Sequence, residues 1–277
     1  MILSIITCGK NDEYAGNFLQ RIQFNLSKLE DNIRELKTNQ IEIIVVDWGS
    51  DKKLYDVLDT SKFQFTRFYH VPKEICSKYS PDSIFSYSKA MNAGYRRSFG
   101  DFVFFIDGDS YIPTQSFINL YNLIKNSDKL KTFYWASRYH IPLEIYQFTQ
   151  DSLVLDDAIS NWSLKKNSWR HEKISLNNFS GAAMGLLLSR NICEESTCWF
   201  EELNKWGWLD IELNARLSRR YTCLGDLEDI NDSCFFHIDH HSIKWGGQSG
   251  GNQNIHANHF KANPDNWGLI EENLNLN

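Results

Sequence analysis

The sequence lacks four features, and each absence excludes a class of protein. None of the six cysteines lies in a C-x-x-C pair, which removes support for a thiolate zinc site or a redox motif. Acidic residues outnumber basic ones by 35 to 29, whereas a nucleic-acid-binding protein is expected to carry a basic face. No stretch approaches the roughly 20 apolar residues that span a bilayer. The N-terminus has no basic leader, so its short apolar run predicts a strand rather than a signal peptide.

These absences favour a reducing, cytoplasmic compartment and a chain without a transmembrane segment. They leave peripheral contact with a membrane open and do not bear on the oligomeric state. The even number of cysteines permits disulfides, but a chain of this length with its own core does not need them. The net charge of −6 does not exclude a phosphate-bearing ligand, because a divalent cation can supply the positive charge locally.

The composition indicates a globular protein rich in aromatic residues. Hydrophobic residues make up 42% of the 277 residues, which is too high a fraction for a disordered chain. The length corresponds to one large domain or two small ones, at roughly 150 residues per domain. Aromatic residues make up 14%, and the nine tryptophans serve either as core material or as ligand-facing surfaces.

Strand and helix patterns alternate over the first half of the chain. Apolar and β-branched runs predict strands at Leu3–Thr7, Ile41–Asp47, Phe63–His70, Asp101–Asp107 and Thr132–Ala136. Apolar residues at three- and four-residue steps predict helices over Ala15–Leu36, Ser86–Phe99 and Gln115–Lys125. This order predicts an α/β fold with a mostly parallel sheet and helices on both faces.

The second half is less regular. The polar region Arg138–Lys173 gives no clear prediction of an element. The small-residue segment Phe179–Leu188, a helix near Asp210–Arg220 and the apolar run Cys234–His237 follow it. The segment Gly246–Asn258 is rich in Gly and Asn and is predicted to be mobile.

Polar residues close three of the predicted strands. Thr7 ends the first strand, Asp47 the second, and Asp107-Gly108-Asp109 the fourth. Ligands bind at the carboxyl edge of a parallel sheet, so these side chains are candidates for a ligand site. Two adjacent carboxylates repel each other unless a cation or a ligand hydroxyl lies between them. Each Asp also has an ordinary structural explanation, as a helix cap or as a solvated turn residue.

Three histidines lie within five residues, at His237, His240 and His241, next to Asp239. Imidazole is a common ligand of manganese and zinc ions, so the cluster is a candidate metal site. A histidine beside an apolar run is also a frequent core residue. The metal interpretation gains support if Asp109 meets the histidines in space, because a mixed oxygen and nitrogen ligand set suits Mn²⁺.

The segment Lys205–Leu217 combines two tryptophans with a helix of leucines at four-residue steps. Asp210 lies in the first turn of that helix, where the helix dipole favours an acid without any catalytic role. The functional interpretation is that Asp210 projects into a pocket as a general base, with Trp206 and Trp208 as flat walls for a sugar ring.

Four segments in order resemble family 2 glycosyltransferases. Residues 43–51, IIVVDWGSD, are similar to the family's VVDDGS-x-D segment, and residues 88–109 resemble its A-x-N-x-G and GD-[YF]-[IV]-x-F-[LI]-D-x-D motifs. Residues 179–190 look like its Gly-rich acceptor-side strand. Residues 206–217 resemble the WGWGGED-x-D-L-x-x-RL segment of the β-1,4-galactosyltransferase and chondroitin-polymerase group.

The resemblance implies a GT-A fold: a single domain over residues 1–277, with a nucleotide-sugar-binding half at 1–110 and an acceptor-binding half at 111–277. The donor is then a nucleotide sugar, with a UDP-linked sugar favoured, and the cofactor is Mn²⁺ or Mg²⁺. By position in the motifs, Thr7 and Asp47 contact the base, Asp107 holds the ribose and Lys89 faces the nucleotide-sugar. Asp109, His237 and His240 hold the cation, and Asp210 is the base of an inverting transfer.

The sequence also departs from the family pattern. Leu209 replaces the Glu that often helps to bind the acceptor, so the acceptor is undetermined. Residues 7–11, TCGKN, lack the usual PVYN, and Met91 replaces an arginine often found before the family's Asn.

The resulting hypothesis is a metal-dependent inverting glycosyltransferase that acts on a carbohydrate hydroxyl, in polysaccharide biosynthesis, with residues 246–254 closing over the donor. Two alternatives remain open. A sugar nucleotidyltransferase shares the general fold, although TCGKN is a poor phosphate cradle. A non-catalytic carbohydrate-binding protein would also use tryptophan surfaces.

Overall fold

The computed structural model describes most of the chain, including nearly all of the predicted strands. The described residues are 1–12, 16–126, 132–142, 145, 154–157, 159, 170–173, 185–205, 207–240, 252 and 255–276. The expected Gly-rich strand from Phe179 falls outside them up to residue 184, and so does most of the predicted mobile segment at residues 246–258. No helix in the described part of the chain is long and apolar enough to cross a bilayer.

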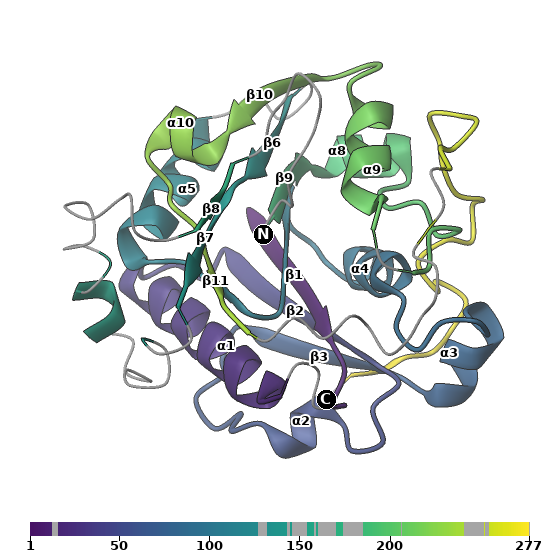
Figure 1. Cartoon of the computed structure of the whole chain (residues 1–277), viewed down its shortest axis with the longest axis horizontal. Helices are drawn as coiled ribbons and strands as arrows, with labels where there is room; N and C mark the ends of the chain where they lie inside the picture. Colours follow the sequence, from purple (N-terminus) through teal and green to yellow (C-terminus); the bar gives the residue numbers. More distant parts are fainter. Residues whose placement is uncertain are drawn as a thin grey trace.

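A central sheet of eight strands runs through the molecule in the order β10-β6-β9-β4-β1-β2-β3-β12 (Figure 1). Its strands are β1 (Leu3–Gly9), β2 (Ile41–Trp48), β3 (Thr66–Val71), β4 (Phe102–Ile106), β6 (Thr132–Ala136), β9 (Gly185–Ser189), β10 (Thr222–Asp226) and β12 (Asn275–Leu276). Four of its neighbouring pairs are parallel, and β9 and β12 are the antiparallel members. The predicted α/β fold with a mostly parallel central sheet is therefore confirmed.

Helices cover both faces of this sheet. They are α1 (Phe18–Glu35), α2 (Leu54–Val57), α3 (Lys73–Tyr79), α4 (Tyr87–Arg96), α5 (Thr114–Asn126), α8 (Arg190–Ser196), α9 (Leu209–Leu217) and α10 (Leu227–Asn231). Figure 1 shows α1 and α5 on one side of the strands and α4, α8 and α9 on the other.

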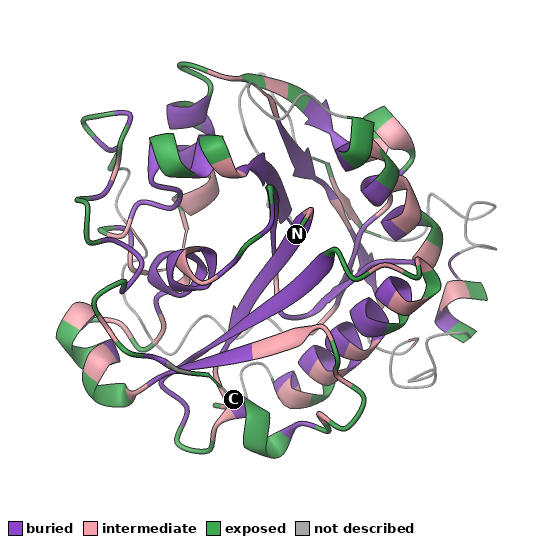
Figure 2. Ribbon diagram, turned by 180° about the vertical axis from the view of Figure 1, so that it is seen from behind, coloured by how far each residue is buried: buried purple, intermediate pink, exposed green. Residues whose placement is uncertain are grey.

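The two faces of the sheet follow from residue alternation along the strands. On β2, Ile43 and Val45 pack with the buried stripe of α1, whereas Ile44 and Val46 pack with α4. Side chains alternate between faces with a period of two, so one unbroken β-branched run supplies two hydrophobic cores. Figure 2 shows the central strands as a buried layer between partly exposed helices.

A second sheet of four short strands stands beside the carboxyl edge of the first and was not predicted. Its order is β5-β11-β7-β8. The strands are β5 (Ser110–Tyr111), β7 (Arg138–Ile141), β8 (His171–Glu172) and β11 (Phe236–Ile238). It joins the residues that follow β4 to a segment more than 120 positions later in the chain.

Candidate functional site

Asp107 and Asp109 lie at the carboxyl end of β4, on a turn that leads directly into β5. The N–H of Ser110 donates to the Asp107 carbonyl oxygen at 3.3 Å, which closes the turn. Asn25 of α1 donates from its side-chain amide to the Gly108 carbonyl at 3.1 Å. The turn is therefore held from the helix side, and its two carboxylates are placed at the edge of the sheet.

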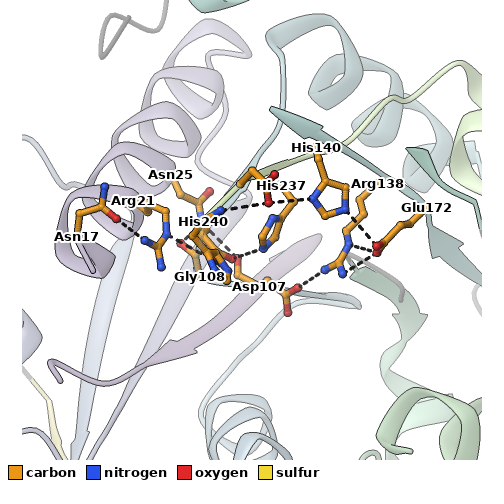
Figure 3. A network of polar contacts seen from close by, with 12 residues as sticks. Asn17, Arg21, Asn25, Asp107, Gly108, Arg138, His140, Glu172, His237 and His240 are labelled. Carbon is orange, nitrogen blue, oxygen red and sulfur yellow. Dashed lines mark hydrogen bonds and ion pairs between the residues drawn. The ribbon is translucent and has the colours of Figure 1, made fainter. Parts of the chain in front are cut away.

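The pairing of β5 with β11 brings the two histidines to Asp109. His237 lies opposite Ser110 in this antiparallel pair, and the N–H of Ile238 donates to the Asp109 carbonyl at 3.0 Å. His237 Nε2 lies 3.2 Å from Asp109 Oδ1, and His240 Nε2 lies 3.4 Å from Asp109 Oδ2 (Figure 3). Three of the predicted site residues therefore meet.

The electrostatics of this cluster favour an ionised carboxylate at Asp109. Burial alone would raise the pKa of Asp109, but the charge of His237, the hydrogen bonds from both histidines and the charge of Arg21 hold it well below its usual range. Burial lowers the pKa of His237, which Asp109 offsets in part. Metal ions bind the ionised form of a carboxylate and the neutral form of imidazole.

The three side chains fit a divalent cation. A ligand atom of each lies within 4.8 Å of the others, and Asp109 and His237 are buried. One carboxylate oxygen and two imidazole nitrogens form a donor set that suits Mn²⁺ better than an oxygen-preferring ion such as Mg²⁺. The role of this cluster in metal binding stays a prediction.

Arg21 of α1 was not anticipated from the sequence. Its side chain is fully buried, and its Nε lies 3.5 Å from Asp109 Oδ2. Another guanidinium nitrogen donates to the Gly16 carbonyl at 2.7 Å. In the sequence Arg21 lies directly before Ile22 on an amphipathic helix and belongs to no motif, so only the packing of α1 against the turn reveals it.

Asp107 has a different environment. Arg138 NH1 lies 3.5 Å from its Oδ2, and the Tyr87 hydroxyl lies 3.5 Å from its Oδ1. Burial raises the pKa of Asp107 to about 7; Arg138 opposes the shift, whereas Asp109 and Asp210 add to it. Burial and the charge of Asp107 raise the pKa of Tyr87 well above its usual range, so its hydroxyl keeps its proton.

The region around Arg138, which gave no prediction, supplies a charged network next to the candidate site. Glu172 of β8 accepts from Arg138 Nε at 2.8 Å and lies 3.4 Å from His140 Nε2. His140 Nδ1 lies 3.6 Å from Asp239. Figure 3 shows this network continuing from the Asp109 cluster. Strands of two to four residues are too short for periodicity to reveal, although the alternation Arg138-Tyr139-His140 is the signal that was available.

Thr7 lies on β1 and Asp47 on β2, and both residues are buried. Asp47 accepts from the Ser50 hydroxyl and from the Leu54 N–H at 2.9 Å, and it lies 3.0 Å from His70 Nδ1. The Thr7 hydroxyl has no hydrogen-bond partner among the described residues. Their contact with a base stays a prediction.

Lys89 is directed toward a backbone carbonyl. Its Nζ donates to the Glu201 carbonyl at 2.5 Å, and the side chain is buried. Burial lowers its pKa. The structure therefore shows Lys89 bound to the backbone at residue 201, and its contact with a donor stays a prediction.

Asp210 lies in the first turn of helix α9, directly after Leu209. Its charge contributes to the raised pKa of Asp107 and of Tyr87, after the larger effect of burial. Gly207 and Trp208 precede the helix with φ of +86° and +66°, and such a turn is costly for Trp208. Trp208 is 38% exposed, as a surface for a ligand requires, whereas Trp206 falls outside the described residues.

Comparisons with known proteins identify the family of the chain. A family model described as glycosyltransferase like family 2 matches residues 22–225, which is well over half of the chain. Comparison with curated proteins gives no match.

Among solved structures, Staphylococcus aureus TarS 1-349 matches with a TM-score of 0.51 at 15% identity, over 86% of this chain and 60% of that one. The same protein in complex with UDP-GlcNAc matches with a TM-score of 0.51 at 12% identity, over 88% and 60%. The mannosyltransferase PcManGT from Pyrobaculum calidifontis, in complex with GDP-Man and Mn²⁺, matches with a TM-score of 0.50 at 15% identity, over 88% and 58%. The chain thus spans about 60% of the length of these proteins, and the likeness is one of fold.

Proposed function

From the premise that the chain belongs to the glycosyltransferase like family 2, and so is a glycosyltransferase, we propose that it transfers a sugar from a nucleoside-diphosphate donor to a carbohydrate hydroxyl in a metal-dependent, inverting reaction. A UDP-linked sugar is the proposed donor. The observation that carries this proposal is the meeting of Asp109, His237 and His240 at the carboxyl edge of the sheet.

In the proposed reaction, each acidic residue has a separate task. Asp107 accepts hydrogen bonds from the ribose hydroxyls, while Asp109, His237 and His240 hold the cation. When bound, that cation neutralises charge on the leaving diphosphate as a Lewis acid. Asp210 takes the proton of the acceptor hydroxyl. The acceptor oxygen attacks the anomeric carbon on the face opposite the diphosphate, which leaves with the electrons of its bond to that carbon, so the configuration inverts.

Family membership favours this function over the two alternatives from the sequence. A nucleotidyltransferase would need a glycine-rich phosphate cradle after β1, where residues 7–11 read TCGKN. A carbohydrate-binding protein without catalysis would not need a carboxylate near both Asp107 and Tyr87, where Asp210 lies. The same proposal includes a single domain over residues 1–277, with a donor-binding half at 1–110 and an acceptor-binding half at 111–277. It also includes a cytoplasmic location and a role in polysaccharide biosynthesis.

A panel of nucleotide sugars tests the proposal. The purified chain is incubated with each donor, with Mn²⁺ or with a chelator, and the released nucleotide is measured. We expect slow Mn²⁺-dependent hydrolysis of one donor class, with UDP-sugars ahead of GDP-sugars. Equal release in chelator would contradict the metal requirement, and release from GDP-sugars alone would contradict the choice of base.

A further inference from the structure

A second set of cation-binding side chains lies next to the Asp109 cluster and shares only His237 with it. His140 of β7, His237 of β11 and Asp239 each offer a ligand atom within 4.8 Å of the other two. His140 and His237 are buried, and their rings lie 5.2 Å apart. Two imidazoles and one carboxylate are a ligand combination used by transition metals, and it is richer in nitrogen than Ca²⁺ or Mg²⁺ sites.

His237 has one ring nitrogen available for this second set. Its Nε2 faces Asp109 at 3.2 Å, whereas its Nδ1 is buried and has no hydrogen-bond partner among the described residues. A buried imidazole nitrogen without a partner is costly, and a bound ion would remove that cost. The parallel pairing of β11 with β7 places His140 directly opposite His237, which fixes the two rings on neighbouring strands.

The other nitrogen of each histidine faces a carboxylate. His237 Nε2 lies 3.2 Å from Asp109, and His140 Nε2 lies 3.4 Å from Glu172. Histidines that bind a metal through one nitrogen usually donate the other N–H to a carboxylate, which fixes the tautomer and strengthens the ligand. Both imidazoles of the second set therefore have the outer partner that a metal ligand needs.

The spacing is close to that of a tetrahedral ion. Zinc–nitrogen and zinc–oxygen bonds of about 2.0–2.1 Å place neighbouring ligand atoms about 3.3 Å apart. His140 Nδ1 lies 3.6 Å from Asp239 Oδ1. The Asp239 side chain is 40% exposed, and its Oδ1 also accepts from the His240 N–H at 3.1 Å.

We propose that His140, His237 and Asp239 form a second divalent-cation site, which takes a nitrogen-preferring ion such as Zn²⁺. A neutral imidazole has one lone pair and one N–H. An ion on Nδ1 of His237 therefore leaves the proton on Nε2, which then donates to Asp109 and no longer binds an ion there. The two sites compete for His237, and Zn²⁺ in the second site opposes Mn²⁺ in the first.

Arg170 is the group that an arriving ion displaces. Its NH2 lies 2.9 Å from His140 Nε2 and 3.2 Å from Nδ1. The Arg170 side chain is 61% exposed, so the guanidinium can turn into solvent. Removing this positive charge with Arg170→Gln should strengthen Zn²⁺ binding.

The existence of the site does not depend on the proposed transferase reaction, but the opposition between the two ions does. Calorimetric titration with Zn²⁺ alone, without nucleotide, separates the sites through a matched pair of substitutions. His140→Gln removes a ligand of the second site only, and His240→Gln removes a ligand of the first site only. We expect Zn²⁺ affinity to fall at least about tenfold in His140→Gln and to be retained in His240→Gln.

Asp239→Asn, at a half-exposed position, repeats the test at a residue whose replacement spares the core. Unchanged Zn²⁺ affinity in both His140→Gln and Asp239→Asn would overturn the second site, as would an equal loss in His240→Gln. In a separate titration followed by Mn²⁺ electron paramagnetic resonance, Zn²⁺ should release bound Mn²⁺ from the wild-type chain, and at least about tenfold more Zn²⁺ should be needed in His140→Gln.

The outcomes distinguish this proposal from the proposed function. If Zn²⁺ binds with the expected pattern but the wild-type chain binds no Mn²⁺, the second site stands and the proposed manganese-dependent mechanism fails. If Mn²⁺ binds and is released by equal Zn²⁺ in both proteins, the opposition through His237 is wrong.

Discussion

Asp107 and Asp109 are two residues apart on one turn, yet the pKa values of their carboxyl groups are shifted in opposite directions. Asp109 is surrounded by His237, His240 and Arg21, and its pKa lies well below the usual range. Asp107 has Arg138 alone on the positive side, and burial with two neighbouring acids raises its pKa to about 7. The positive groups around Asp109 therefore outweigh the effect of burial, whereas Arg138 alone does not do so at Asp107. The always-ionised Asp109 suits a cation, and Asp107 suits a neutral hydroxyl-bearing ligand.

Asp210 is the residue on which the proposed chemistry depends. Replacing it with Asn keeps the size of the side chain and removes its ability to take a proton. We expect the rate of sugar transfer to fall about 100- to 10,000-fold, the usual contribution of a general base, while Mn²⁺-dependent nucleotide binding is unchanged. Steady-state transfer rates and calorimetric nucleotide titrations check the two halves of this prediction.

Glu212, two residues further along α9, offers a comparison for that substitution. It forms a buried ion pair with Arg216 at 2.8 Å, so its replacement should lower stability rather than the chemical rate. Full transfer activity in Asp210→Asn would remove Asp210 from the mechanism.

At the scale of elements, α4 lies unusually close to the sheet because of Gly94. A Cβ at this position would lie 2.6 Å from Ile6 Cγ2 and 3.1 Å from Val46 Cγ2. Alanine gains about 1 kcal/mol over glycine in a helix, but overpacking a rigid core costs about 1–3 kcal/mol. We expect Gly94→Ala to lower the free energy of unfolding, as measured by urea denaturation.

The double variant with Ile6→Ala tests the cause of that loss. Removing the Ile6 side chain makes space for the new methyl group, so the combined loss should be smaller than the sum of the single losses. A simple sum would show that the helix is destabilised for another reason.

The contact between α4 and the C-terminal segment depends on pH through Glu201. Its Oε1 accepts from Asn92 at 2.9 Å and from the Gly268 N–H at 2.8 Å. Burial raises the pKa of Glu201, although these two hydrogen bonds and the charge of Lys89 lower it. An acid whose pKa is higher in the folded state destabilises the fold progressively as pH rises from its unfolded pKa to its folded pKa.

Glu201→Gln should remove this pH-dependent cost while its amide oxygen keeps both hydrogen bonds. We expect the variant to match the wild-type chain near pH 4 and to be more stable at pH 8. Urea midpoints at the two pH values measure this difference. A variant whose relative stability did not rise with pH would show that Glu201 is ionised without penalty.

The length of the elements explains which parts could be predicted from the sequence. The strand predictions at Leu3–Thr7 and Ile41–Asp47 agree with β1 and β2, because long β-branched runs are typical of buried parallel strands. The four-stranded sheet was missed because β5 and β8 have two residues each. A periodic pattern needs several residues to appear. The residues that β5 and β8 place beside the site therefore gave no periodic signal in the sequence.

At the scale of the whole molecule, the candidate site joins segments that are distant in the chain. Asp109 follows β4, His237 and His240 come from β11 and the residues after it, and Arg21 lies on α1. Motif resemblance suggested the first three, whereas Arg21 could be found only once α1 was packed against the turn. The ligands of the ion come from segments that are far apart in the chain. An ion that binds them therefore links these segments, and it can do so only in the folded state.

That linkage predicts a ligand-dependent rise in melting temperature. A ligand that binds only the folded chain at 100 times its Kd stabilises it by about 2.7 kcal/mol, which corresponds to a rise of roughly 5–8 °C for a chain of this size. We expect Mn²⁺ with UDP to produce such a rise, because the cation neutralises the diphosphate beside Asp109. UDP without Mn²⁺ should produce little of it, since Asp107 and Asp210 repel an uncompensated anion. Asp109→Ala serves as the control in the same thermal scan, and an equal rise in that variant would mean that the nucleotide binds elsewhere.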